Sequence, residues 1–370
     1  MTGGVPRLPV VRLYESVRTA HLERARQLAP ASIVHREVRY DFDPALAEGL
    51  DLVQAGRVAG AVAVARSDVR VLEVNEPLMT SSLPATALAL AALAVRGVVR
   101  RGRVEVVSYA IGNADPFAAA TAPSWRTRLR RRGERVLARA VWRRLDRVVF
   151  GTDAARRTYA EVLGAPAPRT AASTVHALPA PHPGAGGAAR PPVVAFVGAL
   201  AERKGVRVLL AAWPLVLSRR PEARLVVLGK GPLEDEVRSA LAADPSALLE
   251  VDPPRDRIHE VLDGARVLTL PSQPSPTWRE QVGLPIVEGL SHGCTVVATT
   301  ETGLADWLVE HGHVVVPEAG SAEVLADGLV TALDLARRAD DVLADLPARD
   351  GRLAADDVLV AEGVVAGGSR

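Results

Sequence analysis

Short apolar runs bounded by turn residues recur along the second half of the chain, and a helix-like stretch follows each of them. The runs are Val193–Gly198, Arg224–Gly229, Leu248–Val251, Arg266–Pro271, Thr295–Thr299 and His313–Pro317. Runs of this length, rich in β-branched residues and alternating with helices, are typical of parallel strands in an α/β domain. The pattern therefore predicts a doubly wound α/β domain over residues 193–345.

The first half of the chain shows the same alternation. We expect strands at Val10–Tyr14, Val58–Ala65, Val69–Val74, Val104–Tyr109 and Arg147–Phe150, and helices at His21–Leu28, Pro84–Val95 and Arg126–Leu145. The segment APHPGAGGAARPP, residues 180–192, has a composition that suits an interdomain linker. The sequence thus predicts a Rossmann-like N-terminal domain at 1–179, the linker, a second such domain at 193–345, and a tail at 346–370. One arrangement of this tail packs it back on the first domain.

Composition bears on the compartment and the partners. Lys and Arg number 45 against 43 Asp and Glu, so the net charge does not indicate a nucleic-acid-binding protein. The single cysteine, Cys294, cannot form an intramolecular disulfide, and no signal peptide opens the chain. Arg96 interrupts the most apolar run, 84–99, which is also too short to span a bilayer. We therefore expect a cytoplasmic protein. No ligand spacing for a metal is evident, and we expect no metal or cofactor.

Two carboxylates flank the start of a predicted helix in the segment PTWREQVGLPIVEG, residues 276–289. Pro285 suits the first helical position and Gly293 suits the cap that ends the helix. Glu288 then lies one turn inside the helix and Glu280 in the loop before it. Backbone N–H groups at the start of the helix favour a phosphate, and adjacent carboxylates can accept hydrogen bonds from sugar diols. These features suit a nucleotide sugar; alternatively, the glutamates only favour the helix dipole.

The same residues resemble a known family. The E-x7-E spacing of Glu280 and Glu288 is similar to that of retaining family 4 glycosyltransferases of the GT-B fold. The resemblance continues through VVAFVGALAERKGVRVLLAAW, RLVVLGKGP, TWREQ, GLPIVEGLSHG, TVVAT, ETGLADWL and VVVPEAGSAEVLADGL, and it covers Val193 to about Leu333. In the first half only DRVVFGTDAARRTYAEVLG, Asp146–Gly164, is similar to the family.

The resemblance implies two Rossmann-like domains facing a central cleft. It also implies retaining transfer of a hexosyl unit from a nucleotide-diphosphate sugar to an acceptor hydroxyl, without a metal. Glu288 would hold the ribose, Glu280 would contact the donor sugar, and Lys204 would neutralise the diphosphate. The remaining donor-binding positions implied by the family are Gly198, Gly229, Gly231, Val282, Gly283 and Leu284. For Gly229 and Gly231, a tight turn after a strand is an equal alternative.

The sequence departs from the family pattern at three places. Ala199 stands where the family usually has an arginine, so either Arg203 compensates or donor binding is weak. Val282 replaces a common phenylalanine. In the first half, the family's usual glycine-rich loop and histidine are absent from the corresponding places. The candidates to contact the reacting carbon from that side are His21, Tyr109 and Asn113; a histidine at the start of a helix can equally be a capping or surface residue.

A strongly basic segment lies in the first half. Ten arginines occur between Arg126 and Arg147, interleaved with apolar residues and accompanied by two acidic residues. Such a segment can lie on an anionic membrane, which would place the protein at the inner membrane face. The alternative is a solvated helix with an ordinary buried stripe. Nucleic acid is disfavoured because aromatic residues are only 4% of the chain and no base-stacking motif accompanies the arginines.

Three other functions fit parts of the sequence. A nucleotide-sugar epimerase or a sugar phosphorylase of the same fold would bind a similar ligand. A non-catalytic partner subunit that binds a nucleotide sugar without turnover would agree with Ala199 and the divergent first half. Transfer to an acceptor distinguishes the glycosyltransferase from all of these.

Overall fold

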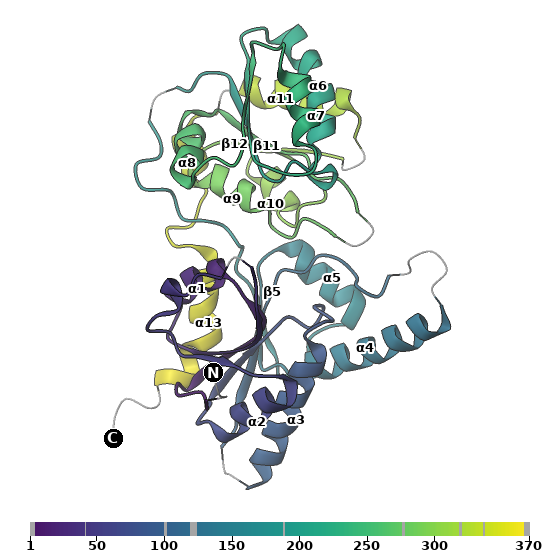
Figure 1. The fold of residues 1–370 in the computed structure, drawn as a ribbon, viewed down its shortest axis with the longest axis vertical. Coiled ribbons are helices and arrows are strands. Elements are labelled where there is room, and N and C mark those ends of the chain that lie inside the picture. Colours follow the sequence, from purple (N-terminus) through teal and green to yellow (C-terminus); the bar gives the residue numbers. More distant parts are fainter. Residues whose placement is uncertain are drawn as a thin grey trace. The chain divides into compact units, whose positions relative to one another are not determined.

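The computed structural model describes residues 4–40, 42–99, 102–118, 124–187, 189–275, 278–317, 320–335 and 337–365. Contacts divide the chain into two units. The first comprises Met1–Gly151, Ala155–His176 and Arg352–Arg370, and the second comprises Thr152–Ala154 and Ala177–Gly351. Each unit contains one parallel sheet with helices packed against it, which confirms the predicted fold class of two doubly wound α/β domains (Figure 1).

The first unit contains a seven-stranded sheet in the order β3-β2-β1-β4-β5-β6-β7. All neighbouring pairs are parallel. Its strands are β1 (Val10–Val17), β2 (Ser32–Val38), β3 (Leu52–Gln54), β4 (Val71–Val74), β5 (Glu105–Ala110), β6 (Arg147–Phe150) and β7 (Ala171–Thr174). Its helices are α1 (Thr19–Ala25), α2 (Arg57–Arg66), α3 (Leu83–Val99), α4 (Trp125–Arg144), α5 (Asp153–Leu163) and α13 (Gly351–Val365).

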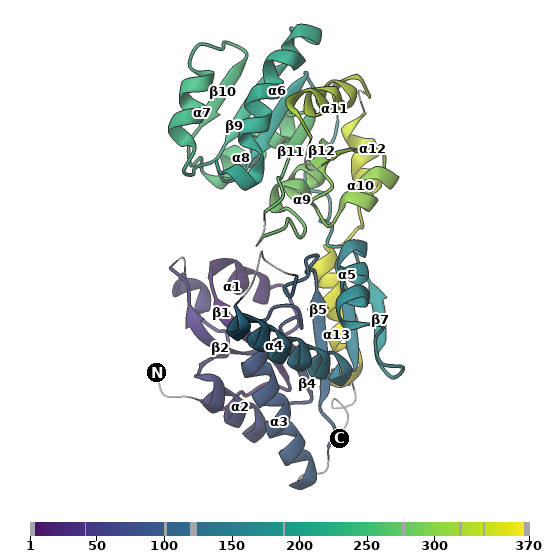
Figure 2. The same ribbon diagram turned by 90° about the vertical axis from the view of Figure 1, so that its right-hand side faces the viewer.

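The two faces of this sheet are covered by different parts of the chain. Inward-facing residues such as Val11 and Leu72 pack with residues of α2, α3, α4 and α5. The alternate residues, such as Val10 and Val71, pack with Ala355 and its neighbours in α13. Side chains of a strand alternate between the faces, so each strand contributes to both layers. The last helix of the chain therefore completes the core of the first unit, and Figure 2 shows α13 beside β5.

The predicted strand Val58–Ala65 is wrong, because these residues form helix α2. Alanine is abundant in this segment, and alanine has the highest helix propensity. The buried residues of α2 include Gly60, Ala61 and Val64, which lie on one helical face. A Cβ atom at Gly60 would lie 3.4 Å from Cγ1 of Val34, so the small residues let α2 pack closely on the sheet.

The second unit contains a six-stranded parallel sheet in the order β10-β9-β8-β11-β12-β13. The six predicted strands are all present, as β8 (Val193–Val197), β9 (Arg224–Leu228), β10 (Ala247–Glu250), β11 (Val267–Leu270), β12 (Thr295–Thr299) and β13 (Val314–Val316). The helices are α6 (Val206–Arg219), α7 (Glu234–Leu241), α8 (Arg255–Gly264), α9 (Leu284–Ser291), α10 (Ala305–Glu310), α11 (Ala322–Leu335) and α12 (Ala339–Ala344). Figures 1 and 2 show α11 and α9 on different sides of β11 and β12. No helix within the described ranges combines the length and the apolar character needed to cross a bilayer.

Candidate donor-binding site

The sheet of the second unit has a point where the chain reverses its direction of winding. From β8 the chain continues to β9 on one side and later returns to β11 on the other. In parallel α/β sheets, ligands bind outside the carboxyl ends of the strands at such a point. Lys204 follows β8, in a short 3₁₀ helix at Glu202–Lys204, and Glu280 follows β11. Both predicted residues therefore lie at the expected edge of the sheet.

Lys204 and Glu280 contact one another. The Lys204 ammonium donates a hydrogen bond to Oε2 of Glu280, and both residues are buried, at 8% and 7% exposure. The Ser272 hydroxyl lies 3.0 Å from the same carboxylate oxygen and donates to it. A buried charge is stabilised only when it is paired and hydrogen-bonded, and this pair meets that condition. The site thus holds a lysine and a carboxylate in fixed positions.

Trp278 packs against both basic residues of the loop after β8. Its ring centroid lies 5.0 Å from Nζ of Lys204 and 4.5 Å from Cζ of Arg203. The carbonyl oxygen of Arg203 also accepts a hydrogen bond of 2.9 Å from the backbone N–H of Gln273. A cation over an aromatic face is attracted to it, so Trp278 holds the two side chains beside the β11 loop. Arg203 and Lys204 therefore both contact the Trp278 ring, while Ala199 contributes no charge.

Helix α9 begins as the sequence predicts. Gly283 precedes it with a φ of 83°, Pro285 occupies its first turn, and Gly293 follows its end with a φ of 78°. Positive φ at these two positions favours glycine. Glu288 is half-buried on α9, and Oε1 of its carboxylate lies 3.8 Å from the Arg255 guanidinium. Burial raises the pKa of Glu288, and Arg255 partly opposes this shift.

The glycines after β8 and β9 pack the loops of these strands together. A Cβ atom at Gly229 would lie 1.8 Å from the carbonyl oxygen of Gly198, and one at Gly231 would lie 2.5 Å from that of Leu200. The Leu200 N–H also donates a 3.0 Å hydrogen bond to the carbonyl of Lys230. Close loop packing alone therefore requires glycine at 229 and 231, which supports the structural interpretation of these residues.

Several residues of the site were missed from the sequence. Ser272 and Trp278 contact the predicted residues as described above. In addition, the Thr302 hydroxyl donates to the carbonyl of Val282 at 3.0 Å, and the Gly303 N–H donates to that of Glu280 at 3.0 Å. These two residues follow β12, the neighbour of β11, so their position after a predicted strand was an available signal. Their side chain and backbone hold the loop that carries Glu280.

The three predicted acceptor-side residues all lie in the first unit, but they belong to different elements. His21 lies in α1, and its ring centroid is 5.3 Å from that of Tyr14 on β1. Tyr109 lies on β5 with the Arg352 guanidinium of α13 4.8 Å from its ring, so it packs beneath that helix. Asn113 is buried beyond the end of β5. His21 follows β1, whereas Tyr109 and Asn113 lie on or after β5, and β4 lies between these two strands in the sheet. The three residues therefore do not come from adjacent strands.

Glu76 orders the loop that leads to Asn113. Its Oε2 accepts hydrogen bonds from the backbone N–H groups of Ile111, at 3.0 Å, and Gly112, at 2.8 Å, and from the Tyr159 hydroxyl, at 3.0 Å. Burial raises the pKa of Glu76, and these three donors oppose that shift. The sequence did not indicate Glu76, because it lies in an irregular segment after β4.

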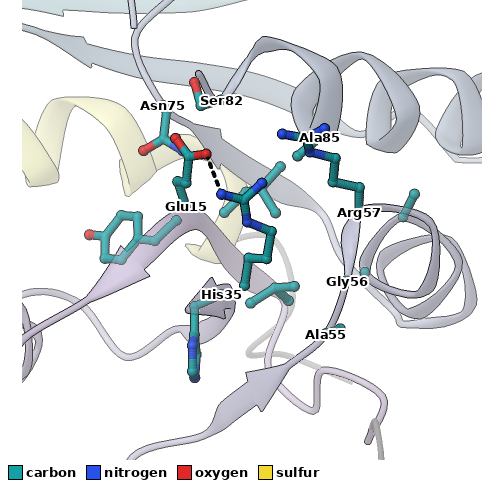
Figure 3. A pocket seen from close by; sticks show the side chains of 14 residues that line it. Glu15, His35, Ala55, Gly56, Arg57, Asn75, Ser82 and Ala85 are labelled. Carbon is teal, nitrogen blue, oxygen red and sulfur yellow. Dashed lines mark ion pairs between the residues drawn. The ribbon is translucent and has the colours of Figure 1, made fainter. Parts of the chain in front are cut away.

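A small pocket lies in the first unit near the carboxyl ends of β1 and β2. Figure 3 shows Glu15, His35, Arg57, Asn75 and Ser82 among its lining residues. The carboxylate of Glu15 accepts an ion pair of 2.8 Å from Arg36. Within the described residues, Nδ1 of His35, Nε of Arg36 and Nδ2 of Asn75 are buried without a hydrogen-bond partner. Buried polar groups normally have partners, so these three nitrogen atoms are exceptions in the wall of the pocket.

Comparison with known sequences agrees with the geometry of the second unit. Residues 191–334 match the family model described as Glycosyl transferases group 1. A glycogen synthase from Paramagnetospirillum magneticum is 32% identical over 123 residues, which is 33% of this chain and 24% of that protein. A phosphatidyl-myo-inositol mannosyltransferase from Mycobacterium tuberculosis is 34% identical over 149 residues, 38% of each chain. The chain thus matches about a quarter to two fifths of the length of these relatives.

Solved structures are similar over nearly the whole chain. Anabaena HepE in complex with UDP has a TM-score of 0.65 and 13% identity, and covers 96% of this chain and 97% of its own. WaaB, a lipopolysaccharide outer core galactosyltransferase, has a TM-score of 0.65 and 11% identity, covering 97% and 99%. WaaG, a glycosyltransferase involved in lipopolysaccharide biosynthesis, has a TM-score of 0.59 and 16% identity, covering 95% and 99%. At these identities the likeness shows the fold, which is the predicted GT-B fold.

Proposed function

Because residues 191–334 carry a glycosyl transferases group 1 domain, we propose that the protein transfers a hexosyl unit from a nucleotide-diphosphate sugar to an acceptor hydroxyl. The transfer retains the anomeric configuration and needs no metal. The observation that carries this proposal is the contact between Lys204 and Glu280. Lys204 follows β8 and Glu280 lies in the loop before α9, so the pair lies where the chain reverses its direction of winding between β8 and β11.

The donor diphosphate binds beside Lys204, Arg203 and the backbone N–H groups at the start of α9. As the bond between the anomeric carbon and the phosphate oxygen breaks, positive charge grows on the sugar and negative charge on the diphosphate. The two basic side chains and the helix N-terminus stabilise the leaving group. The acceptor oxygen then bonds to the anomeric carbon and its proton passes to the departing phosphate oxygen.

The two glutamates have different tasks in this scheme. Glu280 is buried in the loop and paired with Lys204. It therefore holds the lysine in place and also positions the hydroxyls of the donor sugar. Glu288 is accessible on α9, with its side chain 29% exposed, and accepts hydrogen bonds from the ribose diol. The complexes of HepE with UDP and with UDP-glucose support a nucleotide-diphosphate sugar as the donor.

We also propose that the acceptor is presented at a membrane. Helix α4 extends sideways from the first sheet (Figure 1). Trp125, Leu129 and Val136 are 68%, 63% and 69% exposed, and their spacing places them on one helical face. Exposed arginines of α4, among them Arg128 and Arg132, accompany this apolar stripe. The combination suits an interfacial helix on anionic lipid, and the phosphatidyl-myo-inositol mannosyltransferase supports a lipid acceptor.

A panel of nucleotide sugars tests the donor assignment. Each is added to the purified protein, and unfolding temperature and donor hydrolysis are measured; a bound donor stabilises the protein by RT ln(1 + [L]/Kd). Transfer to an added glycan or lipid acceptor supports the proposed reaction. Donor isomerisation indicates an epimerase, phosphorolysis indicates a phosphorylase, and binding with no turnover indicates a partner subunit. A protein that binds none of the donors contradicts the proposal.

A further inference from the structure

Three histidines from separate segments meet in the second unit, away from the donor-binding loops. His182 lies in the segment before β8, His259 lies on α8, and His292 directly follows α9. The ring centroids are 4.3 Å apart for His182 and His292, 5.0 Å for His182 and His259, and 5.1 Å for His259 and His292. One nitrogen atom of each ring lies within 4.8 Å of the other two. This cluster could not be recognised from local sequence spacing.

The backbone fixes the positions of these residues. The His182 N–H donates a 2.8 Å hydrogen bond to the carbonyl of Ser291, the last residue of α9. The His292 N–H donates to the carbonyl of Glu288 at 3.2 Å, and His259 lies in the middle of α8. The three side chains are therefore held together by two helices and one anchored loop.

Two of the three rings meet nitrogen to nitrogen, and the third has a ring nitrogen with no hydrogen-bond partner among the described residues. Nδ1 of His292 donates to the Asp263 carboxylate at 2.7 Å, which leaves Nε2 as the acceptor. That Nε2 lies 2.9 Å from Nδ1 of His259, so the two rings share one proton. Nδ1 of His182 is buried and has no hydrogen-bond partner among the described residues.

The surroundings of His259 and His292 oppose protonation of these two rings. Burial lowers the pKa of His292, although Asp263 opposes the shift. Burial, His182 and Arg255 lower the pKa of His259, with Asp256 and Asp263 acting in the opposite direction. Neutral imidazole is the form that binds metal ions. A carboxylate that accepts a hydrogen bond from the other nitrogen of a ligand histidine, as Asp263 does from His292, orients the ring and raises its basicity.

We propose that His182, His259 and His292 bind one divalent transition-metal ion, of which Zn²⁺ is the best match for three imidazole nitrogens. The ion takes the place of the proton between His259 and His292, which moves through water to Nε2 of His259 and leaves that ring neutral, and the ion also binds Nδ1 of His182. Small ring rotations bring the nitrogens to the spacing of about 3.3 Å that Zn–N bonds of ~2.0–2.1 Å require in a tetrahedral site. Water occupies the fourth position.

The site does not take part in the proposed sugar transfer. His292 lies at the C-terminal end of α9, and the eight residues of this helix separate it from Gly283 by about 12 Å along the axis. The ion instead joins the segment before β8 to the middle of α8 and to the C-terminal end of α9. We therefore expect it to stabilise the second unit, and this inference is independent of the proposed function.

Calorimetric titration of Zn²⁺ into the untagged, metal-free full chain tests the proposal. We expect one ion per chain, a higher unfolding temperature for the second unit, and affinity that falls in acid as the histidines become protonated. With Co²⁺ as a probe, visible d–d absorption should report a tetrahedral site. His182→Gln and His259→Gln should each weaken Zn²⁺ binding at least tenfold and abolish the Co²⁺ spectrum. Asp263→Asn should weaken binding about 10–100-fold.

His311→Gln is the matched control, because His311 is in the same unit but stacks on Trp307 outside the cluster. It should leave Zn²⁺ affinity unchanged. The proposal would be overturned if the wild-type chain did not bind Zn²⁺ stoichiometrically. It would also be overturned if the His182 and His259 variants bound Zn²⁺ as tightly as the wild-type chain. If these variants lose their circular dichroism spectrum, Asp263→Asn decides, because its side chain is 50% exposed and the substitution preserves shape.

Discussion

At the scale of single residues, Glu280 is paired with Lys204 and Glu288 is not, so we expect substitutions of the two glutamates to have different effects. Glu280→Gln removes the negative charge that neutralises Lys204, and the amide oxygen can still accept the hydrogen bond from Ser272. We therefore predict that its affinity for the nucleoside diphosphate is unchanged or higher, whereas kcat/KM with the nucleotide sugar falls, because sugar positioning matters most in the transition state.

Glu288→Gln should behave in the opposite way. A charge-assisted hydrogen bond is worth about 1.5–3 kcal/mol, so loss of the carboxylate should weaken nucleoside-diphosphate binding by roughly 10–150-fold. Calorimetry with the nucleoside diphosphate, together with kinetics on the nucleotide sugar, compares the two variants. Equal losses of diphosphate affinity in both would contradict separate tasks for the two acids.

Lys204 should affect both stability and turnover. Lys204→Met leaves the Glu280 carboxylate buried without its cation, and breaking a buried pair costs about 3–5 kcal/mol. The double variant Lys204→Met, Glu280→Gln should recover most of this loss in denaturant unfolding but remain inactive, because the diphosphate still lacks its cation. Activity in the double variant at the wild-type level would exclude Lys204 from leaving-group stabilisation.

At the scale of elements, α4 gives a prediction about membranes. Binding to anionic vesicles should fall as salt shortens the Debye length from about 10 Å at 0.1 M to about 3 Å at 1 M. Arg128→Gln with Arg132→Gln should reduce vesicle binding measured by co-sedimentation. The control pair, Arg219→Gln with Arg238→Gln, removes the same charge from exposed positions of the second unit. Equal effects of the two pairs would show that α4 has no special role.

The strands that are buried on both faces gave the clearest sequence signal. Every residue of β11 and β12 is buried, and their runs of apolar, β-branched residues are distinct from helices. The sequence missed β2, whose second half carries His35, Arg36 and Glu37, and β7, a short edge strand with exposed alanines. For α2, an apolar run without clear periodicity was assigned to a strand, although its alanines favour a helix.

The site could be predicted only in part. Glu280 and Glu288 are only eight residues apart, so predicting one helix and the loop before it was enough to position both residues. Lys204 is 76 residues from Glu280 in sequence, and their contact depends on which strands are neighbours in the sheet. The histidine cluster depends in addition on the path of an irregular segment, for which no periodicity exists. Tertiary arrangement, rather than local propensity, decides contacts of this kind.

At the scale of the whole molecule, buried charges attach the last helix to the first strand. Arg12 of β1 donates to Asp356 of α13 at 2.8 Å and to Glu73 of β4 at 2.8 Å, and Arg352 of α13 also donates to Glu73 at 2.7 Å. Both carboxylates, Glu73 and Asp356, lie inside the first unit. The network holds α13 on the sheet in one register.

Asp356→Asn should destabilise the first unit selectively. The substitution leaves Arg12, which is 1% exposed, without one of its two carboxylates, and we expect a loss of about 3–5 kcal/mol. Denaturant unfolding followed by hydrogen exchange should show the loss in β1, β4 and α13. Asp357→Asn, the adjacent and exposed position, is the control. A loss of the same size in strands β8–β13 would contradict the assignment of α13 to the first unit.

The place of α13 also sets the order of events on the ribosome. The sheet face with Val10, Val71, Val107 and Val149 receives its cover only when residues 355–360 have been made. Those residues follow β6 by about 200 positions, which at ~5–20 residues per second is a delay of about 10–40 s. Nearly all of the second unit is complete by Gly351, before α13 emerges. The C-terminal unit can therefore fold first, while the nascent N-terminal strands wait with an open apolar face that a chaperone could occupy.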